Sequence, residues 1–168
     1  ELRRILCQEN TSALIVTHDQ LDALSLSDKV AVMGTKENQG YIAQFAKPEE
    51  VYKNPATVEV ARLTGRCMIL DGVASGVKAD TTIGSIELHN EFQGKIKIVI
   101  RPESLQFKQG KGTSKIIFCA CLGVHFQLTV LCNNQRFHLY SDHAVSIGSI
   151  GSLFCVKPCW AWAEGSIF

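Results

Sequence analysis

The sequence predicts an α/β region over residues 1–65, followed by a small all-β barrel over residues 66–168. Up to Gly65, helix and strand patterns alternate, which is typical of α/β domains. Beyond Gly65 the chain shows only short β-branched or aromatic runs separated by glycine or asparagine, as in sandwiches and barrels. The hydrophobic share of 46% is sufficient for packed cores in both regions.

The first region begins with a helix and a buried strand. Leu2, Ile5 and Leu6 have the spacing of one helix face, so we expect a helix over residues 1–8. The run Ala13–Val16 is continuously apolar, which predicts a parallel strand covered on both sides. Because a helix is already under way at the first residue, we expect the sequence to belong to a longer protein.

A short helix and a hairpin follow. Leu21 and Leu24 share one face of a helix expected over residues 19–26. The hairpin is expected as a strand over 29–33, a polar turn over 34–39 and a returning strand over 40–45.

Two helices end the first region. Pro48 is suited to the first helical turn, and Glu49 and Glu50 lie favourably against the helix dipole. Pro55 ends this helix, and a last helix is expected from residue 57 to residue 63.

The second region contains strand signals alone. Asn133-Asn134 predicts a tight hairpin, because asparagine tolerates positive φ. The expected strands cover residues 96–100, 116–122, 126–131, 137–140 and 153–156.

Charge and cysteine content limit the function classes. The formal net charge is +1, which gives no electrostatic reason to expect a nucleic acid as partner. The seven cysteines include no C-x-x-C pair, so neither a zinc site nor a redox motif is indicated. We interpret Cys119 and Cys121, on one strand face, as small apolar filler. Unpaired thiols in this number favour a reducing cytoplasm.

His18 is the candidate functional residue. It follows the predicted strand Ala13–Val16 and precedes a helix, which places it at the carboxyl edge of a sheet, where α/β domains bind ligands. An imidazole at this edge can donate a hydrogen bond to a phosphate oxygen or orient a water. From position alone, a histidine that merely closes a loop is an equally good interpretation. Asp19 is interpreted as a helix cap.

The chain lacks the other parts of a nucleotide-hydrolysing site. It contains no G-x-x-x-x-G-K-S/T phosphate loop, and no Asp-Glu pair follows a hydrophobic strand to hold magnesium. We therefore expect this chain alone to be inactive.

Several motifs in order resemble the ATP-binding subunits of ATP-binding cassette (ABC) importers. The segment from Thr17-His18-Asp19-Gln20 to Met33 resembles their switch-histidine segment. The hairpin, helix and exit motifs follow as Gly40-Tyr41-Ile42-Ala43-Gln44, Pro48 to Pro55 and Val60 to Gly65. Arg101-Pro102-Glu103 resembles a motif of the TOBE domain, an OB-like barrel appended to many such subunits. One departure is the six residues between Met33 and Gly40, where two are common.

The resemblance implies a fold and a role for each region. Residues 1–65 would be the C-terminal part of a P-loop ABC ATPase domain, and residues 66–168 a TOBE barrel. His18 would be the switch histidine that contacts the γ-phosphate of ATP, with no metal ligand in this chain. The phosphate loop, signature motif and Walker B strand would precede Glu1, so the intact subunit would use ATP with Mg²⁺ and this part alone would bind neither.

The resemblance also implies partners and a location. The intact subunit would pair with a second copy of itself and with transmembrane permease subunits, and would serve a solute-binding protein outside the cell. It would lie in the cytoplasm, on the inner face of the membrane. The barrel ending resembles ferric-iron importers, while oxyanion, polyamine and sugar systems remain open.

The alternative from another class is a regulatory or solute-sensing module in which the barrel does the work. His138 and Tyr140 share one strand face and are the candidate ligand surface, although ordinary strand surface is the favoured interpretation. A nucleic-acid-binding barrel is disfavoured by the charge balance and by an aromatic share of 8%.

Overall fold

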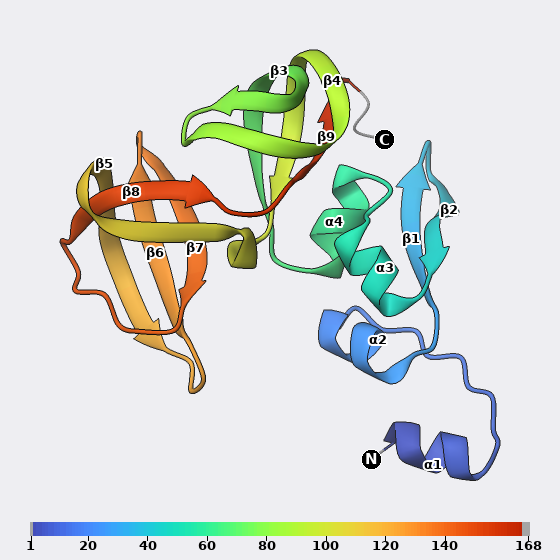
Figure 1. Cartoon of the computed structure of the whole chain (residues 1–168). Coiled ribbons are helices and arrows are strands. Elements are labelled where there is room, and N and C mark those ends of the chain that lie inside the picture. The colour runs from blue at the N-terminus through green and yellow to red at the C-terminus, as the bar shows by residue number, and fades with distance from the viewer. Residues whose placement is uncertain (1, 166–168) are drawn as a thin grey trace. The chain divides into compact units, whose positions relative to one another are not determined.

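The computed structural model describes residues 2–165 (Figure 1). Glu1, where the first helix was predicted to begin, and the last three residues of the predicted barrel lie outside this range. The chain divides into two compact units, with the boundary between Gly65 and Arg66. Within the described range, no helix has the length and apolar character that crossing a membrane would require.

The first unit contains four helices and one hairpin within its described residues. They are α1 (Leu2–Gln8), α2 (Gln20–Leu26), β1 (Val30–Lys36), β2 (Gln39–Ala46), α3 (Pro48–Lys53) and α4 (Val58–Thr64). All four helices were predicted, with bounds within two residues of those observed. The sheet of this unit is the antiparallel pair β1–β2.

The hairpin turn is tighter than the sequence predicted. Lys36 pairs with Gln39, so Glu37 and Asn38 alone connect β1 to β2. These two residues have φ of 50° and 64°, the conformation of a two-residue hairpin turn whose twist matches the strands. The prediction of a polar turn over 34–39 was wrong because polar residues on an exposed hairpin can continue a strand. Of the six residues between Met33 and Gly40, four continue the two strands and two form the turn.

The helix α3 begins at a proline, as the sequence indicates, and α4 begins at a side-chain cap. Pro48 occupies the first turn of α3, together with Glu49 and Glu50. The Thr57 hydroxyl accepts a hydrogen bond of 3.2 Å from the amide of Val60 at the start of α4. The small core of the unit is formed by Val32, Val51 and Val60.

The predicted strand Ala13–Val16 is not formed. These residues have no regular secondary structure, and Leu14 and Val16 are 94% and 92% exposed. A parallel strand exists only when neighbouring strands supply its hydrogen bonds and helices cover its faces. The described residues of this unit offer only the β1–β2 hairpin, so the predicted parallel layer is absent from them.

The second unit is built from strands. They are β3 (Met68–Thr81), β4 (Gly84–Ile100), β5 (Leu105–Cys121), β6 (Phe126–Cys132), β7 (Gln135–Ser141), β8 (Ile150–Cys155) and β9 (Trp160–Ala163), with the short 3₁₀ helix η1 (Pro102–Ser104) before β5. The five predicted strands are confirmed within β4 to β8, and several are longer than expected. The strands β3 and β9 were not predicted.

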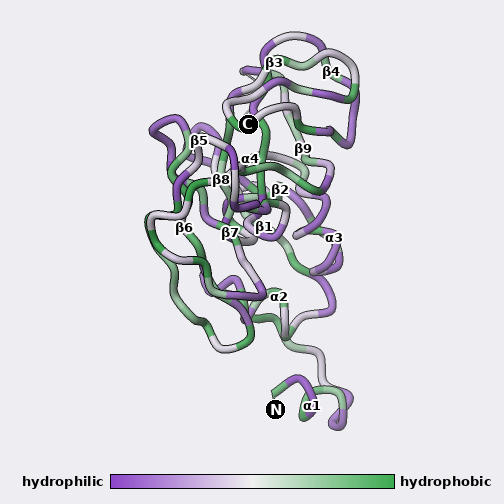
Figure 2. Tube along the Cα trace, turned by 60° about the vertical axis from the view of Figure 1, so that its left-hand side comes forward, coloured by the Kyte–Doolittle hydropathy of each residue, from purple (hydrophilic) through white to green (hydrophobic). Residues whose placement is uncertain are grey.

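The strands form two sheets over one core. The orders are β3-β4-β9 and β7-β6-β5-β8, so the described strands do not close into the single barrel that was predicted. In Figure 2, hydrophobic and hydrophilic stretches alternate along the β3–β4 hairpin, as expected of strands with one buried face. Buried residues of both sheets, among them Ile98, Leu128 and Phe137, belong to the same core. The chain passes from the larger sheet to the smaller one between β8 and β9 (Figure 1).

Candidate functional site

His18 lies in a short turn that leads into α2. On one side of it, the amide of Asp19 donates a hydrogen bond of 2.9 Å to the hydroxyl of Thr17. On the other side, Asp19 Oδ1 accepts hydrogen bonds from the amides of Leu21 and Asp22 at 2.8 and 3.0 Å. The interpretation of Asp19 as a helix cap is thus confirmed. Both neighbours of His18 are therefore engaged in hydrogen bonds that shape the turn before α2.

The turn is also tied to the rest of the first unit. Gln20 Nε2 donates to the carbonyl of Arg62 at the end of α4, at a distance of 3.5 Å. Arg3 Nη2 of α1 lies 2.7 Å from Asp28 Oδ1, just after α2. Both side chains of this ion pair are largely exposed, so it contributes little to stability.

The His18 side chain is exposed to solvent. An exposed imidazole at a fixed turn can donate a hydrogen bond to an anionic oxygen or hold a water for attack. It cannot bind a nucleotide triphosphate by itself, because the phosphates need several donors and a cation. The sequence supplies no phosphate loop, and residues 2–165 contain no cluster of acidic, histidine or cysteine side chains suited to a metal ion. The exposed imidazole of His18 is thus able to make one hydrogen bond to an anionic oxygen such as that of a phosphate.

His138 of the second unit is engaged by a residue of the neighbouring strand. His138 Nδ1 lies 3.1 Å from the hydroxyl of Thr129 on the adjacent strand. Burial, followed by the positive charges of Arg66 and Arg136, lowers the pKa of His138.

Two aromatic side chains of this unit pair with histidines. Tyr140 meets the ring of His125 edge-on, with centroids 4.5 Å apart. Trp160 stacks on His89 at the same centroid distance. His138 and Tyr140 are thus engaged by neighbouring side chains on the strand surface.

The sequence analysis missed one close pair of reactive side chains, Cys155 and Cys159. Their Sγ atoms lie 3.4 Å apart, where β8 ends and the chain turns toward β9. The available signal was Pro158 between the two cysteines, because proline fixes φ and favours a turn. The interpretation of Cys119 and Cys121 as buried filler is not met at Cys121, which is exposed.

The chain is similar to curated import ATP-binding proteins. No protein-family model matches the chain. It is 32% identical over 161 residues to the spermidine/putrescine import ATP-binding protein PotA of Borrelia garinii subsp. bavariensis, a match over 92% of this chain and 45% of the relative. It is 31% identical to PotA of Clostridium acetobutylicum, over 90% of this chain and 44% of that protein.

A third relative has a different named solute. The Fe(3+) ions import ATP-binding protein FbpC 2 of Pectobacterium atrosepticum is 33% identical over 111 residues, which cover 66% of this chain and 31% of the relative. The chain spans less than half the length of these curated relatives.

Proposed function

We propose that this chain is the C-terminal part of an ATP-binding subunit of an ABC importer, because its homologues are such subunits. Residues 1–65 would complete an α/β ATPase domain, and residues 66–168 would form its TOBE-type appendage. The observation that carries the proposal is a match to import ATP-binding proteins that runs through 92% of this chain, across both units.

The exposed segment before His18 supports the same proposal. Leu14 and Val16 are almost fully exposed, although an apolar run of this kind is typical of a strand inside a sheet. Unpaired backbone and apolar side chains are stabilised when adjacent strands cover them. We propose that those strands belong to the remaining part of the subunit, and that pairing with them places His18 at the carboxyl edge of the completed sheet.

His18 is proposed as the switch histidine of that domain. Bound ATP with Mg²⁺ would supply the phosphoryl group that is transferred to water. The imidazole would donate a hydrogen bond to a γ-phosphate oxygen and help to hold the attacking water. The Thr17–Asp19 turn would fix the direction from which the imidazole approaches.

The test is His18→Ala in the intact subunit. Nucleotide affinity should stay within about twofold of the parent, while ATP turnover should fall by about 100-fold or more, the usual effect of removing a positioned acid–base group. His143→Ala is the matched control, because His143 is also exposed and lies after β7 in the second unit. Normal turnover by the His18→Ala subunit would overturn the assigned role.

The proposed partners follow from this identity. Two copies of the intact subunit would close on ATP and drive transmembrane permease subunits, which receive solute from a separate binding protein. The subunit would work in the cytoplasm against the inner face of the membrane. Purification of the intact subunit with its permease, and of a nucleotide-dependent dimer, would test both contacts.

The proposed solute is a polyamine rather than ferric iron. Both PotA proteins match about nine-tenths of this chain, whereas the iron relative matches two-thirds of it. Uptake of labelled spermidine that depends on the intact gene would support the proposal, and uptake of ferric iron alone would contradict it.

A further inference from the structure

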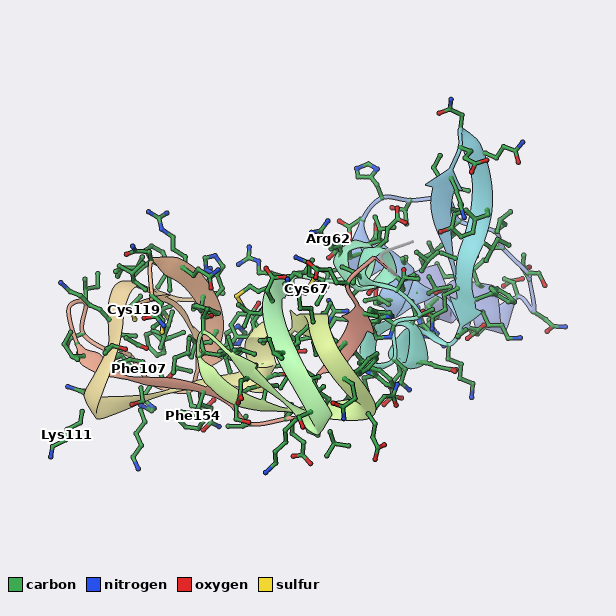
Figure 3. The ribbon with its side chains drawn as sticks, turned by 90° about the horizontal axis from the view of Figure 1, so that it is seen from above. Arg62, Cys67, Phe107, Lys111, Cys119 and Phe154 are labelled. Carbon is green, nitrogen blue, oxygen red and sulfur yellow. The ribbon has the colours of Figure 1, made fainter. Side chains whose placement is uncertain are left out.

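The crossover between the two sheets of the second unit carries two thiols in contact. Cys155 is the last residue of β8 and follows Phe154, which Figure 3 labels. Cys159 immediately precedes β9. Their Sγ atoms are 3.4 Å apart, and both lie against the carbonyl oxygen of Lys157, at 3.3 and 3.6 Å.

The backbone holds the two thiols together. The amide of Val156 donates to the carbonyl of Ser104 at 2.8 Å, next to β5. The amide of Cys159 donates to the carbonyl of Glu87 on β4 at 2.8 Å, and the carbonyl of Cys159 accepts from His89 at 3.1 Å. The segment 155–159 is therefore anchored at one end to each sheet, and Pro158 stiffens the turn between them.

The two sulfur atoms differ in access and in acidity. Cys155 is half-buried, whereas Cys159 is only 3% exposed. The hydrogen bond from the Cys159 thiol is the main cause that lowers the pKa of Cys155 to about 7, against the opposing effect of burial. The same pairing, with burial, raises the pKa of Cys159. One accessible nucleophile thus stands beside one shielded thiol, the arrangement of an attacking and a resolving cysteine.

We propose that Cys155 and Cys159 form a redox-sensitive thiol pair that reacts with low-molecular-weight disulfides. The Cys155 thiolate attacks one sulfur of the small disulfide, which breaks its S–S bond, forms a mixed disulfide and releases one small thiolate. Cys159 then loses its proton and attacks Cys155 Sγ, which forms the Cys155–Cys159 bond and releases the second small thiolate. The two protons lost by the protein are taken up by the two leaving thiolates. Two protein thiols are oxidised and one small disulfide is reduced.

The geometry requires little movement for this closure. The sulfur atoms must approach by about 1.4 Å to reach the S–S bond length of about 2.05 Å. The product links the end of β8 to the start of β9, and so fixes the crossover between the two sheets. This inference does not depend on the proposed importer function.

The test uses the 168-residue chain treated with oxidised glutathione, followed by alkylation and trypsin. Cleavage does not occur between Lys157 and Pro158, so residues 137–168 leave as one peptide that contains Cys155 and Cys159 and no other cysteine. The expected result is this peptide without alkyl groups and lighter than its reduced form by the mass of two hydrogens. Recovery of the peptide with both thiols alkylated, or with glutathione retained on Cys155, would overturn the proposal.

Variants separate the two roles. Cys159→Ser should halt the reaction at the mixed disulfide on Cys155, and should slow glutathionylation of Cys155 near neutral pH by about tenfold as its pKa returns toward the ordinary value. Cys155→Ser should leave the buried Cys159 unmodified. Cys121→Ser, at an exposed cysteine of β5, is the matched control and should still lose two hydrogens from the 137–168 peptide. Equal reaction of the wild-type and Cys159→Ser chains at Cys155 would refute the pairing.

Discussion

The side-chain amide of Asn133 donates a hydrogen bond of 2.8 Å to the carbonyl oxygen of Thr82, 51 residues earlier in the chain. Asn133 lies in the β6–β7 turn and Thr82 in the β3–β4 turn, so the bond joins hairpins that belong to different sheets. The Thr82 hydroxyl adds a second contact by donating to Gln135 Oε1 at 3.1 Å. The two sheets are thus linked at their turns as well as through their shared core.

Asn133→Gly should destabilise the second unit, whereas Asn134→Gly should not. Both residues have positive φ, 47° and 61°, which glycine adopts without strain. Only the first substitution removes the bond to Thr82, and its loss should lower the free energy of unfolding by about 1 kcal/mol. Urea unfolding of the two variants measures the difference, and equal midpoints would contradict the role of this contact.

The Asn133-Asn134 hairpin could be predicted because its signal is local: two residues set the turn and the flanking strands pair with each other. The prediction of a strand over Ala13–Val16 was wrong because an apolar run forms a strand only where neighbouring strands pair with it, and the described residues of this unit supply only the β1–β2 hairpin. β3 was missed because Asp71, Gly72 and Gly76 interrupt its apolar pattern, while its long pairing with β4 compensates.

Some features of the candidate sites are set by residues close in sequence, and others by residues far along the chain. The cap at Asp19 depends on residues within three positions, so the sequence predicts it. The role proposed for His18 rests on resemblance and not on contacts that the described residues make with its side chain. The contact between Cys155 and Cys159 depends on a turn fixed by Ser104 and Glu87, which the local sequence does not specify.

Asp19→Ala should fray the start of α2. It removes the oxygen that accepts from the amides of Leu21 and Asp22, at a cost of about 1 kcal/mol to the helix. Hydrogen exchange at these two amides should therefore accelerate by about fivefold. Asp19→Asn retains a capping oxygen and should preserve most of the protection, so equal acceleration in both variants would argue against capping.

Gln44 should be required for the link between β2 and the α3–α4 connection. Its Nε2 donates to the carbonyl of Asn54 at 3.0 Å, and its Oε1 accepts from the amide of Ala56 at 2.8 Å. Gln44→Ala loses both bonds and should speed exchange of the Ala56 amide by about tenfold. Gln44→Glu keeps an acceptor for that amide but cannot donate to Asn54, so it should retain protection at Ala56 while still lowering stability. Unchanged exchange of the Ala56 amide in Gln44→Ala would show that the two hydrogen bonds of Gln44 contribute nothing to its protection.

The stability of the second unit should decrease as pH falls, through His138. Burial, and then the charges of Arg66 and Arg136, lower the pKa of His138 below the ordinary value of 6.5. Between the lowered and the ordinary pKa the unfolded chain binds more protons than the folded one, so stability rises with pH in that window. The stabilising contribution of neutral His138 should be fully present above about pH 7 and should be lost as pH falls from about 6.5 through the lowered pKa.

Thermal unfolding at about pH 8 and about pH 5 tests this prediction. Between these two pH values the midpoint temperature of His138→Gln should drop less than that of the parent chain, because glutamine takes up no proton in this range. His143→Gln, in the exposed loop after β7, should keep the full drop. An identical pH dependence in the parent and His138→Gln would exclude His138 as its source.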